Sequence, residues 1–261
     1  MSADAVSRRF DFAQSLIREA GALALGYFQR LDSLTIKSKG LQDFVSEADL
    51  KTELLIRSRI AELFPEDAFF GEETGATGLE GARGVWVVDP IDGTQPFLSG
   101  MRTWCVSIAF VYDGALQFGL VFSPSEDELF IGGLGIPATL NGKPIAPHAA
   151  TSLAEGMTSV GFSYRTGSER TLAILARLLA ANGMFQRNGS GALGLCYVAC
   201  GRVIGYVELH INSWDCLAAI AIIHAAGGRT NEFLVGDALA KGNVIIAGNA
   251  AVYDQVAALL G

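Results

Sequence analysis

The sequence has no hydrophobic run long enough to cross a lipid bilayer, although half of its 261 residues are hydrophobic. Its longest apolar stretch, residues 217–226, contains His224 and falls well short of the ~20 residues that a transmembrane helix needs. The N-terminal segment also lacks the layout of a secretory signal, because Arg8 and Arg9 come before any apolar run. These two absences predict a cytoplasmic protein that does not enter membranes.

Cysteine, histidine and clustered basic residues are also scarce. The four cysteines form no Cys-x-x-Cys pair and the three histidines have no paired ligand spacing, so buried reduced thiols are expected rather than disulfides or a zinc site. The formal net charge is −8, and no cluster of lysine and arginine offers a surface to a nucleic-acid polymer. A small phosphorylated ligand is not excluded, because bound cations can reverse the sign of an acidic cleft.

Two helices are expected near the start of the chain. Apolar residues recur at helical spacing over residues 6–30, although Gly26 lies within this stretch. Ser46 is followed three residues later by Asp49 and then by periodic apolar residues, which is the pattern of a capping box. It predicts a second helix that ends near Phe64-Pro65.

A group of strands is expected next. Residues 85–88 have the composition of a buried strand, and Asp89-Pro90 is expected to stop it. Asp113-Gly114 has the form of a hairpin turn between two further strands. The strands predicted after residue 100 are residues 104–112, 115–122 and 128–132. Together they indicate a largely antiparallel meander.

The pattern changes to alternating helices and strands in the second half of the chain. Helices are expected near residues 169–181, 193–199 and 214–226, and strands near residues 203–209 and 244–247. This alternation is typical of α/β structure. We therefore expect an α+β half over residues 1–145 and an α/β half over residues 146–261, with a ligand cleft at their shared interface.

One segment, residues 86–94 (WVVDPIDGT), carries most of the chemical information. Two acidic residues flank a proline directly after a buried strand, and such a turn can aim both carboxylates at one point. An isolated Asp-Gly pair is more often an ordinary turn. The whole string is much harder to explain in that way.

The string Asp89-Pro90-Ile91-Asp92-Gly93-Thr94 resembles the signature of the inositol monophosphatase family, whose members are magnesium-dependent, lithium-sensitive phosphatases. Three further segments resemble its other motifs, in the family's order: residues 43–49, Gly71-Glu72-Glu73 and Ser213-Trp214-Asp215. A glutamate pair in a loop, a capping aspartate or an aspartate in a helix's first turn each has an ordinary structural explanation. Their joint occurrence favours the family. The resemblance implies an α+β fold, a layered α/β/α/β/α sandwich, and a homodimer.

The resemblance also implies a metal site. Magnesium prefers oxygen ligands in octahedral geometry, so carboxylates from separate segments together with a substrate phosphate suit it. By the resemblance, Asp89 bridges two ions, with Glu72 and the Ile91 carbonyl on one and Asp92 and Asp215 on the other. Two or three Mg²⁺ ions are expected.

The mechanism implied by the family is hydrolysis by a metal-activated water, without a covalent phosphoenzyme. The water lies near Glu72 and Thr94, and Asp49 orients the Thr94 hydroxyl. The backbone amides of Gly93 and Thr94 hold phosphate at a helix start. Lys39 resembles a basic residue that faces the metal site, and we expect it to act as an electrostatic helper.

The substrate is expected to be a small polar alcohol phosphate. Contacts are implied for Gly93, Thr94, Ser190, Gly191, Glu208 and Asp215. Glu208 can accept a hydrogen bond from a hydroxyl of inositol monophosphate, the first candidate, or from the amine of histidinol phosphate. The second remains an alternative because Gln95-Pro96-Phe97 and Gly194 depart from the inositol enzymes.

Three other functions are less favoured. Fructose-1,6-bisphosphatases and bisphosphate nucleotidases share the metal motifs but commonly have longer chains. A noncatalytic binding or regulatory protein on the same fold is the alternative outside enzymes. The intact set of acidic residues and Thr94 argues against it, and fold analogy alone does not decide.

Overall fold

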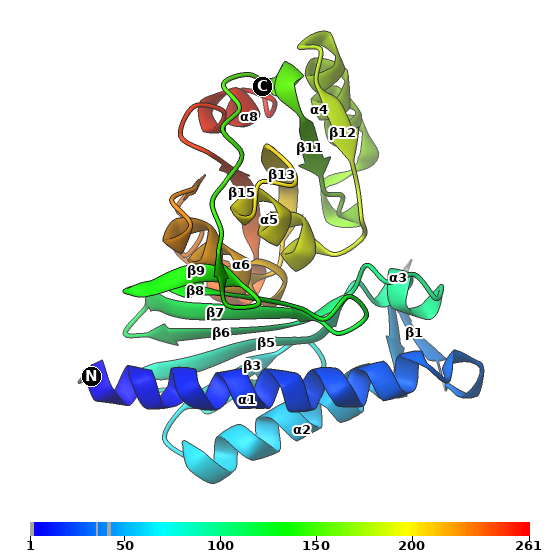
Figure 1. The fold of residues 1–261 in the computed structure, drawn as a ribbon. Coiled ribbons are helices and arrows are strands. Elements are labelled where there is room, and N and C mark those ends of the chain that lie inside the picture. Colours follow the sequence, from blue (N-terminus) through cyan, green and yellow to red (C-terminus); the bar gives the residue numbers. More distant parts are fainter. Residues whose placement is uncertain (1–2, 35, 41–42) are drawn as a thin grey trace.

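The computed structural model describes residues 3–34, 36–40 and 43–261, with the side chains of residues 3, 4, 33, 36–40 and 43–45 left out of the description. Helices and sheets alternate in layers (Figure 1). Helices α1 (Ala3–Phe28) and α2 (Glu47–Leu63) cover one face of an eight-stranded sheet, and α5 (Gly191–Ala199) and α6 (Ser213–Ala225) lie between it and a five-stranded sheet. The outer face of the second sheet is covered by α4 (Ser168–Ala180) and α8 (Tyr253–Ala258). The expected α/β/α/β/α sandwich is confirmed.

The eight-stranded sheet has the order β10-β9-β8-β7-β6-β5-β3-β4. It is the expected meander, because each strand from β5 to β10 pairs antiparallel with the next, whereas β3 pairs parallel with β5. The bounds are β3 Ala68–Gly71, β4 Gly75–Thr77, β5 Gly84–Asp92, β6 Cys105–Tyr112, β7 Ala115–Ser123, β8 Glu128–Gly133, β9 Ile136–Leu140 and β10 Lys143–Pro144. Asp113 and Gly114 both have positive φ angles, as a hairpin turn of the predicted kind requires.

Strand β5 does not stop at Asp89-Pro90, so that prediction is wrong. It continues to Asp92 through a bulge: Asp89 pairs with Ser107 and Asp92 with Cys105, and only one residue on β6 faces the two between them. Proline has no N–H to donate, but the bulge is a place where the ladder is already interrupted. The missing donor therefore does not end the strand.

The bulge decides where the two aspartates point. Side chains alternate between the faces of β5, so Val85 and Val87 pack toward α5 and α6 while Trp86 and Val88 pack toward α1 and α2. Asp89 continues the first of these faces. In a regular strand Asp92 would point to the opposite face, and the extra residue of the bulge turns it back to the side of Asp89.

The second sheet is mixed, with the order β12-β11-β13-β15-β14. The central strands β13 and β15 and helices α4, α5 and α6 correspond to the elements expected in this half. The bounds are β11 Met157–Val160, β12 Met184–Gln186, β13 Gly205–Ile211, β14 Arg229–Thr230 and β15 Asn243–Gly248. Short elements complete the chain: β1 Ile36–Gly40, β2 Asp43–Ser46, α3 Thr94–Leu98, α7 Ala238–Lys241 and the 3₁₀ turns Leu31–Ser33, Leu153–Glu155 and Tyr164–Thr166. The division into halves at residue 145 stays a prediction.

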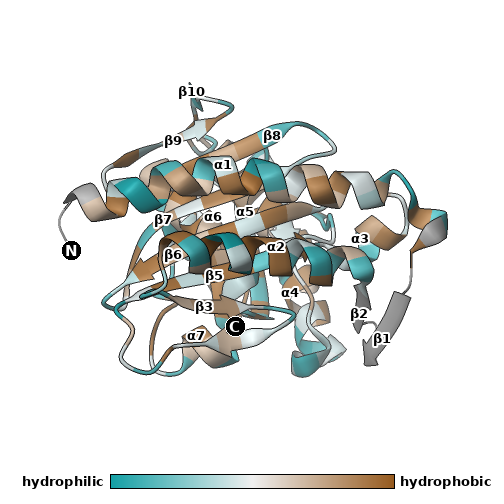
Figure 2. Cartoon of the chain, turned by 90° about the horizontal axis from the view of Figure 1, so that it is seen from below, coloured by the Kyte–Doolittle hydropathy of each residue, from teal (hydrophilic) through white to brown (hydrophobic). Residues whose placement is uncertain are grey.

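Helix α2 begins as the capping box predicts. Ser46 is the N-cap, its hydroxyl accepts from the Ala48 amide at 3.1 Å, and its own amide donates to the Asp49 carboxylate at 2.9 Å. The helix ends at Leu63 with Phe64 as C-cap. Hydrophilic and hydrophobic residues alternate around α1 and α2, as expected for helices with one face in solvent (Figure 2).

Helix α6 is different, because most of its residues are buried between the two sheets. It lies close to the eight-stranded sheet at Gly119 of β7, where a Cβ atom would overlap the backbone of Ala218. No helix among the described residues is both long and apolar enough to span a membrane. Three of the four cysteines are buried and all are free thiols, as expected.

The close contact of α6 with β7 can be tested with glycine substitutions. Gly119→Ala is expected to destabilise the protein by about 1–3 kcal/mol, because the backbone of α6 must move to admit the methyl group. Gly26→Ala is the matched control: it lies in α1 with only the end of the Arg30 side chain near its Cβ position, so it is expected to be neutral or stabilising. Urea unfolding midpoints measure both, and equal midpoints would contradict the packing described.

Candidate active site

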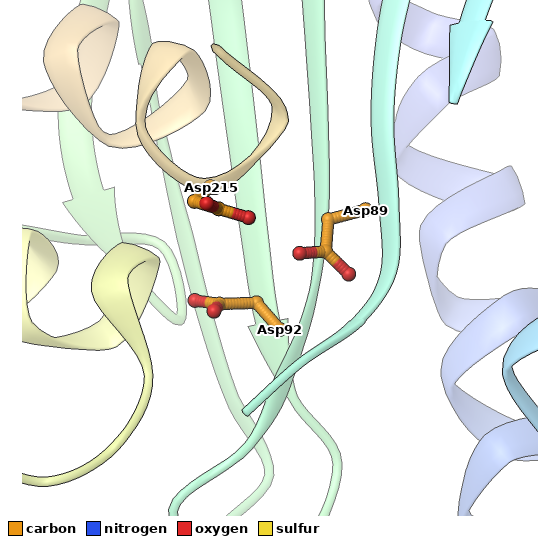
Figure 3. A group of neighbouring side chains, drawn as sticks. All are labelled: Asp89, Asp92 and Asp215. Atoms are coloured by element: carbon orange, nitrogen blue, oxygen red, sulfur yellow. The ribbon is translucent and has the colours of Figure 1, made fainter. Parts of the chain in front are cut away.

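Three aspartates meet where the two sheets and the middle helices come together. Asp89 and Asp92 come from the end of β5, and Asp215 comes from the first turn of α6. Each offers a carboxylate oxygen, and these oxygens lie within 4.8 Å of one another. Figure 3 shows the three side chains pointing toward a common space. Segments far apart in the sequence thus supply one acidic cluster.

The surroundings of Asp89 and Asp215 disfavour negative charge. Burial raises the pKa of Asp89 well above its ordinary value, and the charges of Glu72, Asp92 and Asp215 raise it further. Burial also raises the pKa of Asp215, although a hydrogen bond with the Asp89 carboxyl opposes this shift. Each of these carboxyl groups is therefore harder to ionise than an isolated aspartate.

Asp92 lies against the N-terminus of α5. Its carboxylate accepts hydrogen bonds from the Ser190 hydroxyl at 2.6 Å and from the amides of Gly191 and Ala192 at 3.2 and 2.6 Å. Burial and the charge of Asp215 nevertheless raise the pKa of Asp92 to about 7, against the opposing effect of these donors. Ser190 and Gly191, which the resemblance assigns to the substrate, donate here to Asp92.

Asp215 is held by the capping box of α6. Its carboxylate accepts from the backbone and side-chain nitrogens of Asn212, both at 3.2 Å, and Arg165 donates to the Asn212 side-chain oxygen at 2.6 Å. Sequence reasoning missed Asn212 and Arg165. The three-residue spacing from Asn212 to Asp215 is the signal that could have found the first.

Asp49 and Thr94 lie together beside this cluster. The Thr94 hydroxyl is 3.4 Å from the Asp49 carboxylate and 3.3 Å from the Ile91 carbonyl, either of which can accept its one proton. Asp49 is fully buried and also caps α2, so its structural and its proposed functional contacts coexist. Gly93, with φ of 97°, precedes α3 as its N-cap residue.

A cavity of about 170 Å³ opens over these residues. Glu72 lines it and follows β3 directly, with its amide donating to the Val88 carbonyl at 3.2 Å. The cavity is lined by Glu72, Asp89, Ile91, Asp92, Gly93, Thr94, Ser159, Val160, Gly161, Phe162, Arg187, Asn188, Gly189, Ser190, Gly191, Tyr206, Glu208, Ile211 and Asp215. The predicted site residues with described side chains therefore gather around one cavity, with Asp49 behind Thr94. The backbone of Lys39 lies in β1, and its side chain is outside the description.

Glu208 forms the wall on the side of the second sheet. The Tyr206 hydroxyl donates to its carboxylate at 2.7 Å, and burial raises the pKa of Glu208 to about 8 although Tyr206 and Arg187 oppose the shift. Sequence reasoning missed both of these neighbours. Tyr206 stands two residues before Glu208, so strand alternation could have placed them on one face. Phe162, in a loop, gave no such signal.

The oxygen atoms that line this cavity suit a hard cation as ligands. Carboxylate and carbonyl oxygens are the ligands that magnesium prefers, and positive charge between these carboxyl groups would stabilise their ionised forms. The histidines bond elsewhere: His148 to the Ala150 amide, His210 to the Lys241 carbonyl and His224 to the Thr230 hydroxyl. Structural roles, as expected, fit all three.

Comparison with known proteins identifies the family. A sequence model of the inositol monophosphatase family matches residues 6–260. The chain is 32% identical over 233 residues to Nus factor SuhB of Haemophilus influenzae, covering 88% of this chain and 87% of that protein.

Solved structures agree. Extragenic suppressor protein suhB from Bartonella henselae superposes with a TM-score of 0.90 at 30% identity, over 97% of this chain and 98% of that one. Inositol monophosphatase from Anabaena (Nostoc) sp. PCC 7120 superposes with a TM-score of 0.84 at 30% identity, over 98% of this chain and 96% of that one. This chain therefore belongs to the inositol monophosphatase family.

Proposed function

We propose that this protein is a magnesium-dependent phosphomonoesterase that hydrolyses a small polar alcohol phosphate, with inositol monophosphate as the first candidate. The observation that carries the proposal is the cluster of buried Asp89 and Asp92 with half-buried Asp215, which lines a cavity and whose carboxyl groups have raised pKa values. A protein gains nothing for its stability from such a cluster unless something positive binds there. Perturbed carboxyl groups in a cavity are typical of functional sites.

The residues that would hold magnesium are the three aspartates, Glu72 and the Ile91 carbonyl, and two or three ions are proposed. When bound, magnesium acts as a Lewis acid toward the phosphoryl oxygens and lowers the pKa of the attacking water. Asp89 suits a bridging role because the charges of both Glu72 and Asp215 raise its pKa, so its carboxyl group is close to the proposed ligands of each ion. Asp92 enters the site already held by three donors from α5.

Thr94 suits the task of orienting a water. Its hydroxyl proton is directed inward, toward Asp49 or the Ile91 carbonyl, which leaves the oxygen lone pairs to accept a hydrogen bond from a water in the cavity. Glu72, which also lines the cavity, is the proposed general base that takes the one proton this water loses on attack. Thr94 is therefore proposed as an orienting residue and not as a nucleophile.

Glu208 is proposed to contact the alcohol part of the substrate, because it lines the same cavity as the acidic cluster but belongs to the second sheet. A substrate hydroxyl can bond to it in either protonation state. Histidinol phosphate is the second candidate, because its protonated amine would stabilise the ionised form of Glu208, whose pKa without ligand is about 8. Phe162 also lines the cavity, and an aromatic side chain suits an imidazole ring as a neighbour.

A role without catalysis is the contrasting hypothesis. Several relatives are named Nus factor SuhB, a name that states no phosphatase activity. The described residues retain the complete acidic cluster and the Thr94 contacts, which a purely structural use of the fold would not require. Partners and assembly, including the homodimer, remain predictions from the family.

Asp89→Asn tests the metal site directly. Turnover of the best phosphomonoester is expected to fall at least about 100-fold even at high magnesium, because the central anionic ligand is lost. Asp127→Asn, at a surface aspartate whose side chain is 85% exposed, is the control and should leave turnover unchanged. Phosphate release at low and at high magnesium measures the effect, and near-normal activity of the Asp89→Asn variant at saturating magnesium would remove Asp89 from the site.

Stability without metal should depend on pH in a defined direction. Asp92 and Glu208 have folded-state pKa values of about 7 and about 8, above the ordinary values of about 3.9 and 4.3. The folded state therefore binds more protons than the unfolded state between about pH 4 and pH 8, and the free energy of unfolding falls as pH rises through this window.

Thermal unfolding in chelator is expected to show that fall. Added magnesium should raise the midpoint more at pH 8 than at pH 5, because the ionised carboxylates bind the cation. A midpoint in chelator that stays constant from pH 5 to pH 8 would show that the folded state does not raise the pKa values of these carboxyl groups.

Glu208→Gln distinguishes the two substrates. Loss of a charge-assisted hydrogen bond to an amine is expected to lower kcat/KM for histidinol phosphate about 100-fold, whereas loss of a hydrogen bond to a neutral hydroxyl should cost inositol 1-phosphate about 5-fold. Glu155→Gln, at an exposed glutamate outside the cavity, serves as control. Equal small losses for both substrates would mean that Glu208 does not contact the alcohol part.

A further inference from the structure

Glu53 of α2 is a fully buried glutamate outside the cavity wall. Its two carboxylate oxygens accept hydrogen bonds from the backbone amides of Glu73 at 2.8 Å and Thr74 at 2.6 Å. These are the two residues that follow Glu72 in the chain. A buried carboxylate is unfavourable unless its oxygens are hydrogen bonded, so the segment and the side chain stabilise each other.

The same helix makes a second contact with this segment. Arg57 lies one turn after Glu53 on the same face of α2, and its guanidinium is 3.4 Å from the Thr74 hydroxyl, which accepts. On the other side, the Glu72 amide donates to the Val88 carbonyl of β5. The short connection between β3 and β4 is therefore held between α2 and the sheet.

Gly71 allows this arrangement. A Cβ atom at residue 71 would overlap the Glu53 carboxyl group, so any larger residue would push that carboxyl away from the backbone it holds. The overlap with Glu53 explains why the first position of Gly71-Glu72-Glu73 is a glycine. A glutamate pair in an ordinary solvated loop would need neither the glycine nor a buried carboxylate behind it.

We propose that Glu53 is a positioning residue for the metal site: it fixes the backbone after Glu72 and thereby places the Glu72 carboxylate over the cavity. The inference rests on the proposed function. Asp49 lies one turn before Glu53 in α2 and contacts Thr94. A single rigid helix then sets the positions of both Glu72 and Thr94, the two groups proposed to orient the water.

The test uses the full-length protein and Glu53→Gln. The substitution keeps the size of the side chain but replaces one acceptor oxygen with an NH₂ group, which cannot accept a hydrogen bond from the backbone amide of Glu73 or Thr74. Magnesium binding is measured by titration calorimetry without substrate, and the dissociation constant for the site that includes Glu72 is expected to rise about 10–100-fold. Turnover at subsaturating magnesium should fall and recover partly at high magnesium.

Asp67→Asn is the matched control. Asp67 is another buried carboxylate on the same side of the sheet, held by Arg9 at 2.6 Å and by the Trp86 indole nitrogen at 3.0 Å, away from the Glu72 segment. The Asp67→Asn variant should have a lower urea unfolding midpoint but an unchanged magnesium affinity. If Glu53→Gln does not fold, Glu53→Asp, which keeps the charge and withdraws both oxygens by one methylene, replaces it.

The outcomes separate the two proposals. Wild-type protein that binds no magnesium would overturn the proposed function and this inference together. If wild type binds magnesium and hydrolyses phosphate esters, but the residue 53 variants bind it with unchanged affinity, only the positioning role is overturned. Equal weakening by Asp67→Asn at matched loss of stability would also overturn it, because the effect would then be general.

Discussion

The carboxyl groups of Asp89, Asp92 and Asp215 meet inside the fold, where each disfavours ionisation of the others. Much of the surrounding structure responds to this repulsion with neutral donors. Asp92 receives a hydroxyl and two amides from the start of α5, and Asp215 receives the backbone and side chain of Asn212. These donors reduce the unfavourable energy without removing it, because the pKa of Asp92 is still about 7. The remaining imbalance is what a divalent cation would relieve.

The layered architecture makes this convergence possible. Helices α5 and α6 begin at the junction of the two sheets, so the positive ends of their dipoles lie near the acidic cluster. Their apolar sides pack against both sheets within one continuous core. The same middle layer therefore supplies hydrophobic packing along its length and electrostatic compensation at its N-terminal end.

Local patterns in the sequence predict much of this arrangement. Ser46 and Asp49 predict the start of α2, and Asp113-Gly114 predicts a hairpin. Each of these features depends only on neighbours within a few residues. The family motifs lead to the acidic cluster. The extension of β5 past Pro90 is not predictable in this way, because a proline stops a strand or sits in a bulge according to the partner strand.

Long-range packing explains the remaining differences. Ser190 lies beside Asp92 because α5 packs under the end of β5, and nothing next to Ser190 in the sequence reveals that contact. Phe162 follows β11, whose parallel pairing with β13 brings this segment to the cavity. The partners of Glu53 likewise lie some twenty residues away, on a connection too short to show any periodicity. Resemblance leads to the carboxyl groups of the cluster more readily than to the residues that hold them.

Helix α6 has a consequence for biosynthesis, because it completes both the core and the acidic cluster. Translation proceeds from the N-terminus, so a nascent chain that ends before α6 contains Asp89 and Asp92 but lacks the helix that covers much of one apolar face of the eight-stranded sheet. Asp215 arrives with the helix that covers that face. Burial of the sheet against α6 and completion of the three-aspartate cluster therefore depend on the same helix, and a chain that ends before α6 lacks the Asp215 ligand.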